Sequence, residues 1–189
     1  MKKEIYRKGF HLLFGIIFLI LIYFLGTKLS LFTISIIFLF GLIIALLYKK
    51  EIKIPLFEKI IFSVEREHEK HFPGKAAIIF FLTTILLLTF FSNTNIILIS
   101  LSIMIFADSL AAIIGKKFGK YKIVSKGPWQ KTLAGTLTCF IVCSLILLII
   151  APIHIAVFIA LIATIIEFAP INDNIGMSLA VAILLKLFL

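Results

Sequence analysis

The stretch Ile96–Ile114 reads IILISLSIMIFADSLAAII and contains only three serines and one aspartate, Asp108, among apolar residues. A helix needs about 20 apolar residues to cross the hydrocarbon core of a bilayer. The stretch has no strict alternation of apolar and polar residues and is too long for a barrel strand. Because backbone hydrogen bonds must close within a segment in lipid, it predicts a transmembrane helix with an acidic residue inside it.

Six further apolar stretches of similar character flank this one: Gly9–Gly26, Leu29–Tyr48, Ala76–Phe91, Leu133–Ala151, Ile153–Phe168 and Ile175–Leu189. Hydrophobic residues make up 62% of the 189-residue chain and charged residues 15%, against about 25% charged residues in soluble domains. This composition excludes a soluble globule and a disordered chain. We therefore predict an all-α fold, a polytopic membrane helix bundle of about seven transmembrane helices. Residues 1–189 should form a single integral membrane domain.

The positive charges predict how the bundle is oriented. Of the 19 Lys and Arg residues, 17 fall in residues 1–8, 49–75 and 115–132, which alternate in topology with nearly uncharged turns. Since cytoplasmic loops collect Lys and Arg, we predict a multi-pass protein with a cytoplasmic N-terminus and an active site on the cytoplasmic side. The net charge of +10 then reflects topology and anionic lipid headgroups, and no nucleic-acid partner is expected. Residues 49–75 carry apolar residues at helical spacing, which predicts an amphipathic cytoplasmic loop at the interface.

Three acidic residues lie within or beside apolar stretches instead of in basic loops: Asp108, Glu167 and Asp173. An acid at the bilayer centre costs about 2.5–3.5 kcal/mol and usually marks function. With Asn174, these residues offer the oxygen ligands that Mg²⁺ takes together with substrate phosphates, so we predict a site for Mg²⁺ or another divalent cation. His11 lies about 4.5 Å deeper in the membrane than Lys8 and is expected at the same level. The competing interpretation is a structural pair between each acid and a lysine or a helix end.

The basic, glycine-containing cytoplasmic loop 115–132 is the predicted phosphate-binding element, because lysines supply charge and glycines let backbone amides approach an anion. Lys131 is expected to open the helix that follows, where the helix dipole favours the same anion. The full predicted set is Arg7, Lys8, Gly115, Lys116, Lys117, Gly119, Lys131, Thr132 and Gly135. Gln130 excludes a Walker A loop. Three lysines within six residues speak against Gly115-x-x-x-Gly119 as a helix-dimer motif in lipid. The alternative for the whole loop is a simple topological anchor.

Five motifs occur in order along the chain. They are Arg7-Lys8-x-x-His11-x-x-x-Gly15, Phe72-Pro73-Gly74-Lys75, Ala107-Asp108-Ser109-Leu110-Ala111-Ala112-x-x-Gly115-x-x-x-Gly119, Lys131-Thr132-Leu133-Ala134-Gly135-Thr136, and Glu167 followed by Asp173-Asn174. Together they resemble the CTP-dependent lipid-alcohol kinases: dolichol kinase, phytol kinase and yeast-type diacylglycerol kinase. These kinases are related to phosphatidate cytidylyltransferases. Ala107 stands where that family usually has Gly, and Ala134 where it usually has Glu. The His-Gly-Gly and Asp-Arg-x-Asp signature of the cytidylyltransferase branch is absent.

The resemblance implies phosphorylation of a membrane lipid alcohol, such as a polyprenol, dolichol, phytol-like isoprenoid or diacylglycerol, with CTP as phosphoryl donor. The residues themselves do not separate CTP from ATP. Asp108, His11 and Lys131 are the predicted catalytic residues. We expect Asp108→Asn to remain folded and to be more stable, because a buried charge is removed. Two alternatives stay open: a CTP-dependent lipid cytidylyltransferase, which would release pyrophosphate, and a non-enzymatic transporter, whose charges would lie near the midplane.

Overall fold

The computed structural model describes residues 2–50, 74–126, 129–168 and 172–189. Its elements, in chain order, are α1 (Lys2–Lys49), α3 (Lys75–Phe90), α4 (Thr94–Ser102), the π-helical η2 (Ile103–Ala107), α5 (Asp108–Phe118), β1 (Lys122–Lys126), β2 (Trp129–Thr132), α6 (Leu133–Leu147), α7 (Ile153–Ile166) and α8 (Asp173–Phe188). The predicted helical character is confirmed. The amphipathic segment predicted over 49–75 lies almost entirely outside the described residues.

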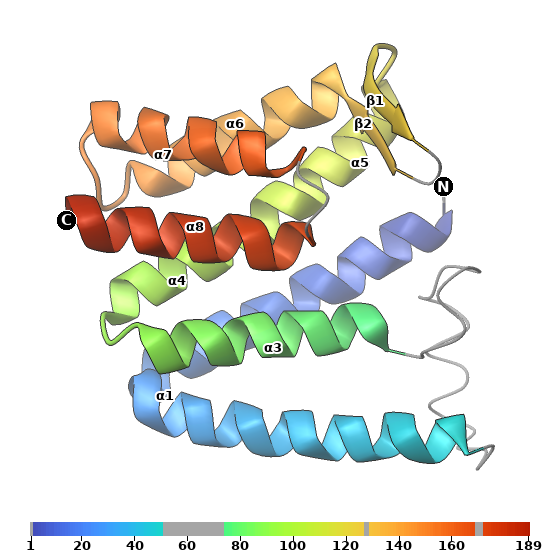
Figure 1. Ribbon diagram of the computed structural model, residues 1–189, viewed down its shortest axis with the longest axis vertical. Helices are drawn as coiled ribbons and strands as arrows, with labels where there is room; N and C mark the ends of the chain where they lie inside the picture. The colour runs from blue at the N-terminus through green and yellow to red at the C-terminus, as the bar shows by residue number, and fades with distance from the viewer. Residues whose placement is uncertain (1, 51–73, 127–128, 169–171) are drawn as a thin grey trace.

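Helix α1 contains a sharp bend at Gly26, where φ is 70° and ψ is −179°. This backbone conformation is readily reached only by glycine, which has no Cβ. Figure 1 shows the two arms of α1 folding back on each other from this point, dark blue before the bend and light blue to cyan after it. The hydroxyl of Ser30 donates to the carbonyl of Leu21 across the bend, at 3.3 Å. The two arms correspond to the first two predicted apolar segments.

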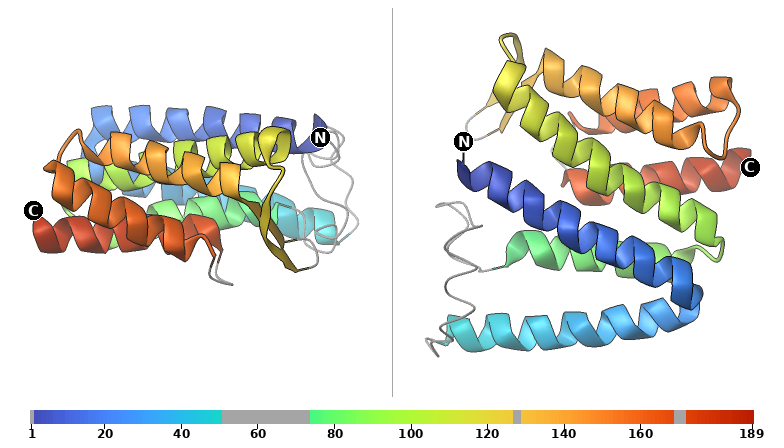
Figure 2. Two further views of the ribbon diagram at one scale, coloured as in Figure 1. Left: turned by 90° about the horizontal axis from the view of Figure 1, so that it is seen from above. Right: turned by 180° about the vertical axis from the view of Figure 1, so that it is seen from behind.

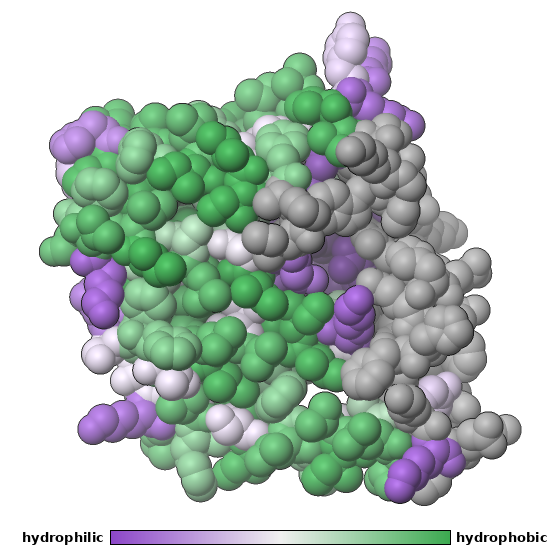
Figure 3. All heavy atoms as spheres, in the orientation of Figure 1, coloured by the Kyte–Doolittle hydropathy of each residue, from purple (hydrophilic) through white to green (hydrophobic). Residues whose placement is uncertain are grey.

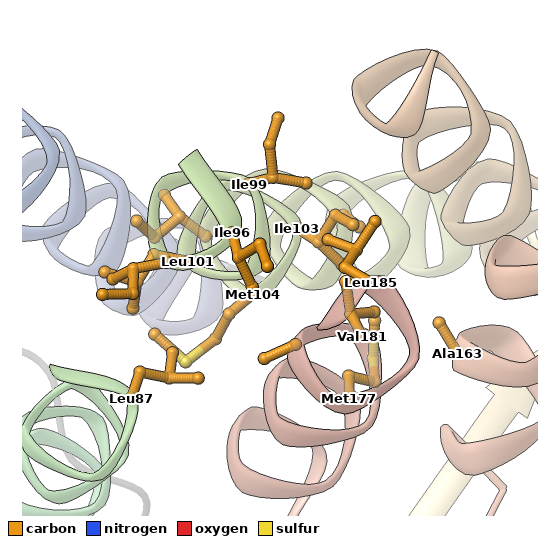
Figure 4. Close-up of a cluster of buried hydrophobic side chains, with 14 of the residues drawn as sticks. Leu87, Ile96, Ile99, Leu101, Ile103, Met104, Ala163, Met177, Val181 and Leu185 are labelled. Atoms are coloured by element: carbon orange, nitrogen blue, oxygen red, sulfur yellow. The ribbon is translucent and has the colours of Figure 1, made fainter. Parts of the chain in front are cut away.

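The helix that runs from α4 through η2 into α5 passes through the middle of the bundle (Figure 2). It contacts the first arm of α1 together with α6 and α8. Figure 4 shows the core at this place, where Met104 of η2 lies near side chains of α3 and α8. Leu101, Met104 and Leu185 are completely buried. Burial of apolar residues from four helices fixes the position of the central helix, and with it the position of Asp108.

The outer surface of the bundle is strongly apolar. Phe24 is 77% exposed and Ile149 73% exposed, and Figure 3 shows hydrophobic residues over much of the visible face, with hydrophilic residues at its edges and right of its centre. A soluble monomer rarely exposes so large an apolar area. Two helical stretches of the described chain, Tyr6–Tyr48 and Thr94–Phe118, are long and apolar enough to cross a membrane, and the other apolar helices have 10–17 residues. The count of seven crossings stays a prediction.

A two-stranded antiparallel hairpin, β1 and β2, stands where a loop was predicted. Ser125 pairs with Gln130 and Lys126 pairs with Trp129. In the sequence, Gly127-Pro128 separates the two strand segments and is a usual turn signal, which the lysine-rich composition obscured. The hairpin changes the expected place of Lys131, which lies in β2 and not in the first turn of α6.

The ends of the elements divide into two groups. Figure 1 shows the N-terminus, the hairpin, the end of the second α1 arm and the start of α3 at one end of the bundle. The C-terminus, the α3–α4 turn and the α6–α7 turn lie at the other end. The first group contains the lysine-rich segments, and we call it the basic end. The segregation agrees with the predicted alternation of loops, while the assignment of the basic end to the cytoplasm remains a prediction.

This orientation predicts the outcome of thiol labelling in intact cells. Cys139 and Cys143, which are buried, would first be replaced by alanine, and single cysteines placed at Ser63, Ser125 or Ser92. A membrane-impermeant maleimide should react with the cysteine at Ser92 alone, because the other two positions lie in the predicted cytoplasmic segments. Reaction at all three positions after permeabilisation is the control. Labelling of the Ser125 position in sealed cells would invert the proposed topology.

Candidate active site

Two buried ion pairs lie at the basic end of the bundle. The ammonium of Lys8 donates to Oδ2 of Asp108, and these side chains are 4% and 14% exposed. The ammonium of Lys131 donates to Oε1 of Glu167 at 2.7 Å, with side chains 18% and 7% exposed. Asp108 also lies within electrostatic range of Lys131, so the two pairs belong to one group of charges. We call Lys8, Asp108, Lys131 and Glu167 the lysine–acid cluster.

Each member of the lysine–acid cluster comes from a different element. Lys8 lies on the first arm of α1, Asp108 begins α5, Lys131 lies in β2, and Glu167 caps the C-terminal end of α7. The paired residues are separated by 100 and 36 positions in the chain. A buried charge without a partner costs several kcal/mol, which explains why each acid has a lysine against it. The structural pairing considered as an alternative from the sequence is therefore present at both acids.

The cluster offers both anion-binding and cation-binding groups. Within the described residues, Oε2 of Glu167 is buried and has no hydrogen-bond partner, so it retains a free capacity for a cation or a donor. The described side chains contain no group of three or more His, Cys, Asp or Glu residues that could hold a metal ion. A Mg²⁺ ion that arrives with nucleotide phosphates needs only one or two carboxylates, and Asp108 and Glu167 fit this mode. The side chain of Asp173 lies outside the described part, and Asn174 lies in the first turn of α8.

His11 takes part in no ion pair in the described structure. Its Nε2 lies 3.4 Å from the carbonyl oxygen of Met104, and its ring packs edge-on against Phe80 with centroids 4.9 Å apart. His11 lies one helical turn beyond Lys8 on α1, so it is close to the cluster. Its described contacts are with backbone and an aromatic ring, and the predicted role of orienting a substrate hydroxyl stays a prediction.

The glycines of the predicted phosphate loop lie in a tight contact between α5 and α6. A Cβ built on Gly115 would lie 2.8 Å from Oγ1 of Thr132 and 3.2 Å from Cα of Gly135, and one on Gly119 would lie 2.1 Å from the carbonyl oxygen of Gly115. Thr132 caps α6 by accepting from the amide of Gly135, at 3.3 Å, and donates to the carbonyl of Gly115, at 3.2 Å. Gly115 and Gly119 therefore leave the space in which α5 packs against Thr132 and Gly135 of the same chain, a contact that was not predicted.

The lysines did not prevent this packing because they lie on another face of α5. Lys116 and Lys117 are exposed, and the ammonium of Lys117 lies 5.2 Å from the ring centroid of Phe118. The amides of Gly119 and Gly135 already form hydrogen bonds within the chain. Phosphate binding by these backbone groups stays a prediction. Arg7, which is half-buried, lies next to Lys8 in the chain at the basic end.

The whole chain matches a known family. The model of the cytidylyltransferase family covers residues 1–189. The chain belongs to the cytidylyltransferase family. It is also 32% identical, over 190 residues, to the uncharacterized protein MJ1137 of Methanocaldococcus jannaschii, covering 97% of this chain and 93% of that protein. No solved structure matches the chain significantly. The match supports a nucleotide-transferring enzyme that uses CTP, in the family to which the kinases resembled by its motifs are related.

Two buried hydroxyl groups that neighbour predicted site residues in the chain of this cytidylyltransferase-family protein were not identified from the sequence. Oγ of Ser109 and Oγ1 of Thr136 are buried and have no hydrogen-bond partner within the described residues. Ser109 follows Asp108 directly, and Thr136 follows Gly135 in α6. Buried polar groups are nearly always satisfied, so these hydroxyls are candidates for ligand contacts. Ser109 and Thr136 lie inside two of the motifs given above, and this position is the sequence signal that could have identified them.

Alanine at the packed glycines of this cytidylyltransferase-family protein should destabilise it. Gly119→Ala places a methyl group against the Gly115 carbonyl and Thr132, and overpacking of this kind costs about 1–3 kcal/mol. Gly41→Ala is the matched control, because it is a helical position with nothing within 4 Å of the added methyl, and alanine favours a helix by about 1 kcal/mol. Thermal unfolding in detergent measures both. Equal stability of the two variants would contradict the tight α5–α6 contact.

Proposed function

We propose that this protein transfers the cytidylyl group of CTP to the terminal phosphate of a membrane lipid and releases pyrophosphate. The observation that carries the proposal is the lysine–acid cluster, in a chain that matches the cytidylyltransferase family over its full length. A buried ammonium group, that of Lys8, and a partly buried one, that of Lys131, suit a polyanionic nucleotide and an anionic acceptor. The location of the cluster at the basic end suits a nucleotide that arrives from the cytoplasm and a lipid that arrives from the bilayer.

The state of the acids favours a phosphate acceptor over an alcohol. A lipid phosphate is already ionised at neutral pH, so its oxygen attacks phosphorus without losing a proton. A lipid alcohol needs a base within hydrogen-bond reach of its hydroxyl. Asp108 and Glu167 are each paired with a lysine ammonium, and they would be engaged by Mg²⁺ once the lysines bind phosphate, so neither is left to take a proton from a hydroxyl. Cytidylyl transfer to a lipid phosphate therefore needs no general base among the described groups, whereas phosphoryl transfer to a lipid alcohol needs one.

The lysines and acids would act by exchanging partners. When the triphosphate enters, Lys8 and Lys131 would bind phosphate oxygens in place of the carboxylates, as charge-assisted hydrogen bonds. Asp108 and Glu167, including the open Oε2 of Glu167, would then be available to hold Mg²⁺ together with the phosphates. The ion would supply neutralisation of phosphate charge at the reacting phosphorus. Ser109 and Thr136 could donate to the remaining phosphate oxygens.

A second candidate is phosphoryl transfer from CTP to a lipid alcohol. It is favoured by the motifs over 107–119 and 131–136, which resemble the lipid-alcohol kinases, and by the lack of the Asp-Arg-x-Asp signature. Ala134, in place of the glutamate usual in those kinases, speaks against it. In this reaction the γ-phosphate moves and CDP leaves, so the two candidates differ in which phosphorus reaches the lipid.

The position of the label in the product separates the candidates. Purified protein in vesicles would receive CTP labelled at the α- or the γ-phosphate, with phosphatidate or with diacylglycerol and polyprenol as acceptors. We expect α-label in the lipid when phosphatidate is present, with one pyrophosphate released per lipid. Transfer of γ-label to an alcohol would replace the first candidate by the second. No transfer of either label with any of these acceptors, in protein shown to be folded, would refute the proposal.

A further inference from the structure

The central helix changes from α to π geometry over Ile103–Ala107, directly before Asp108. A π turn holds one residue more than an α turn and often occurs at functional sites. The extra residue rotates everything after it by about 100° relative to the residues before it. Whether Asp108 faces Lys8 therefore depends on whether the π turn is kept. Ile103, Met104, Ile105 and Ala107 are all completely buried.

The first arm of α1 contacts the π turn through His11. The Nε2 of His11 lies 3.4 Å from the Met104 carbonyl, and because that oxygen can only accept, Nε2 must donate. A π turn interrupts the regular α ladder of backbone bonds, so its carbonyl groups are natural acceptors for a side chain. The edge-on contact with Phe80 of α3 holds the imidazole ring in this orientation.

Gly15, one turn further along α1, contacts the next residue of the π turn. A Cβ on Gly15 would lie 2.6–2.8 Å from three side-chain atoms of Ile105, so only glycine leaves room for this side chain. Lys8, His11 and Gly15 are spaced by three and four residues, which places them on one face of α1. This face thus contacts Met104, Ile105 and Asp108, from the π turn to the first residue of α5.

We propose that His11 is a positioning residue, which donates to the Met104 carbonyl and so maintains the π turn that orients Asp108 toward Lys8. It then does not touch the reacting atoms. The proposal rests on the proposed function only in that Asp108 belongs to the site. It accounts for the spacing Lys8-x-x-His11-x-x-x-Gly15, for which the sequence offered no structural reason.

Replacement of His11 by glutamine separates positioning from acid–base chemistry. Glutamine carries an amide N–H donor at a similar reach but cannot accept a proton as a base. If His11 positions Asp108, His11→Gln should keep lipid labelling from CTP within about threefold of wild type, whereas His11→Leu should lose about tenfold or more, corresponding to one lost hydrogen bond. If His11 is a reacting base, both variants should lose activity alike, which would overturn the proposal.

A spectroscopic signal reports the hydrogen bond without reference to activity. Met104-Ile105 is the only Met-Ile step in the sequence. Protein labelled with ¹³C at methionine carbonyls and ¹⁵N at isoleucine amides therefore gives one carbonyl–amide correlation. This signal should stay near its wild-type position in His11→Gln and move in His11→Leu. A signal that does not move in His11→Leu would show that no such bond exists and overturn the proposal.

Compensation at Gly15 tests the same contact in a second way. Gly15→Ala should lower activity and move the Met104–Ile105 signal, and adding Ile105→Ala should restore part of both, because the clashing atoms are removed. Gly9→Ala is the control on the same helix, since nothing lies within 4 Å of its added methyl. Failure of Ile105→Ala to compensate would contradict the proposal. If wild-type protein lacks CTP-dependent activity while these signals behave as stated, the proposed function fails and the positioning role stands.

Discussion

Asp108→Asn is expected to lower CTP-dependent labelling of lipid roughly 100- to 1,000-fold, the range found when one preorganised electrostatic group is removed from an active site. The carboxylate pairs with Lys8, lies within range of Lys131 and His11, and is only 14% exposed. Asparagine keeps the size of the side chain and removes the charge. Initial rates with labelled CTP measure the effect, and wild-type turnover in the variant would exclude Asp108 from the site.

The same substitution should also destabilise the fold, which reverses the expectation from the sequence. That expectation treated Asp108 as a lone buried charge. In the structure the substitution removes the negative charge that faces the Lys8 ammonium, a side chain only 4% exposed, and removal of one partner of a buried pair costs about 3–5 kcal/mol. The double variant Lys8→Met, Asp108→Asn should recover most of this stability and none of the activity. Denaturant unfolding in detergent distinguishes the loss of folding from the loss of chemistry.

Lys131→Ala should reduce kcat/KM roughly 10- to 100-fold, since one charge-assisted hydrogen bond contributes about 1.5–3 kcal/mol. Lys131 is directed to Glu167 from the last strand before α6. Its loss would remove the proposed phosphate ligand and would leave the buried Glu167 without the Lys131 ammonium. Lys131→Arg should restore only part of the rate, because a planar guanidinium does not replace a compact ammonium.

Lys126→Ala is the matched control, since this lysine lies on the other strand of the same hairpin. A loop that only anchors topology would respond to the number of charges, so the two alanine variants would then behave alike. Steady-state kinetics with varied CTP measures the difference. Equal and small effects of both alanine substitutions on kcat/KM would indicate that residues 115–132 only anchor the topology.

The apolar segments could be predicted because helix formation in lipid depends on local sequence. Each predicted segment coincides largely with a helix, and the break between the first two falls at Gly26, where the bend occurs. The candidate acids were also identifiable, because an aspartate in a long apolar run is costly. Lys8 and Lys131 lie against these acids because elements far apart in the chain pack together. No local sequence pattern predicts that packing.

The hairpin, the π turn and the glycine contacts were not predicted for related reasons. Ile103–Ala107 has no composition that separates π from α geometry, and the residues that it contacts, His11 and Gly15, lie on another helix. The contact of Gly115 with Thr132 and Gly135 was not predicted because lysine density was taken as a property of the whole segment. A helix has distinct faces, and the exposed lysines and the packed glycines lie on different ones.

Photolabelling with a CTP analogue tests the central claim that CTP binds beside the lysine–acid cluster. Purified protein in nanodiscs would be irradiated with 5-iodo-CTP and the modified peptides sequenced, with excess CTP as competitor. We predict CTP-protected labelling at the basic end, in residues 2–12, 108–120 or 122–136, and its loss in the Lys8→Met, Asp108→Asn variant. Protected labelling confined to the opposite end, around Asn93 or Pro152, or labelling that CTP does not reduce, would contradict the account.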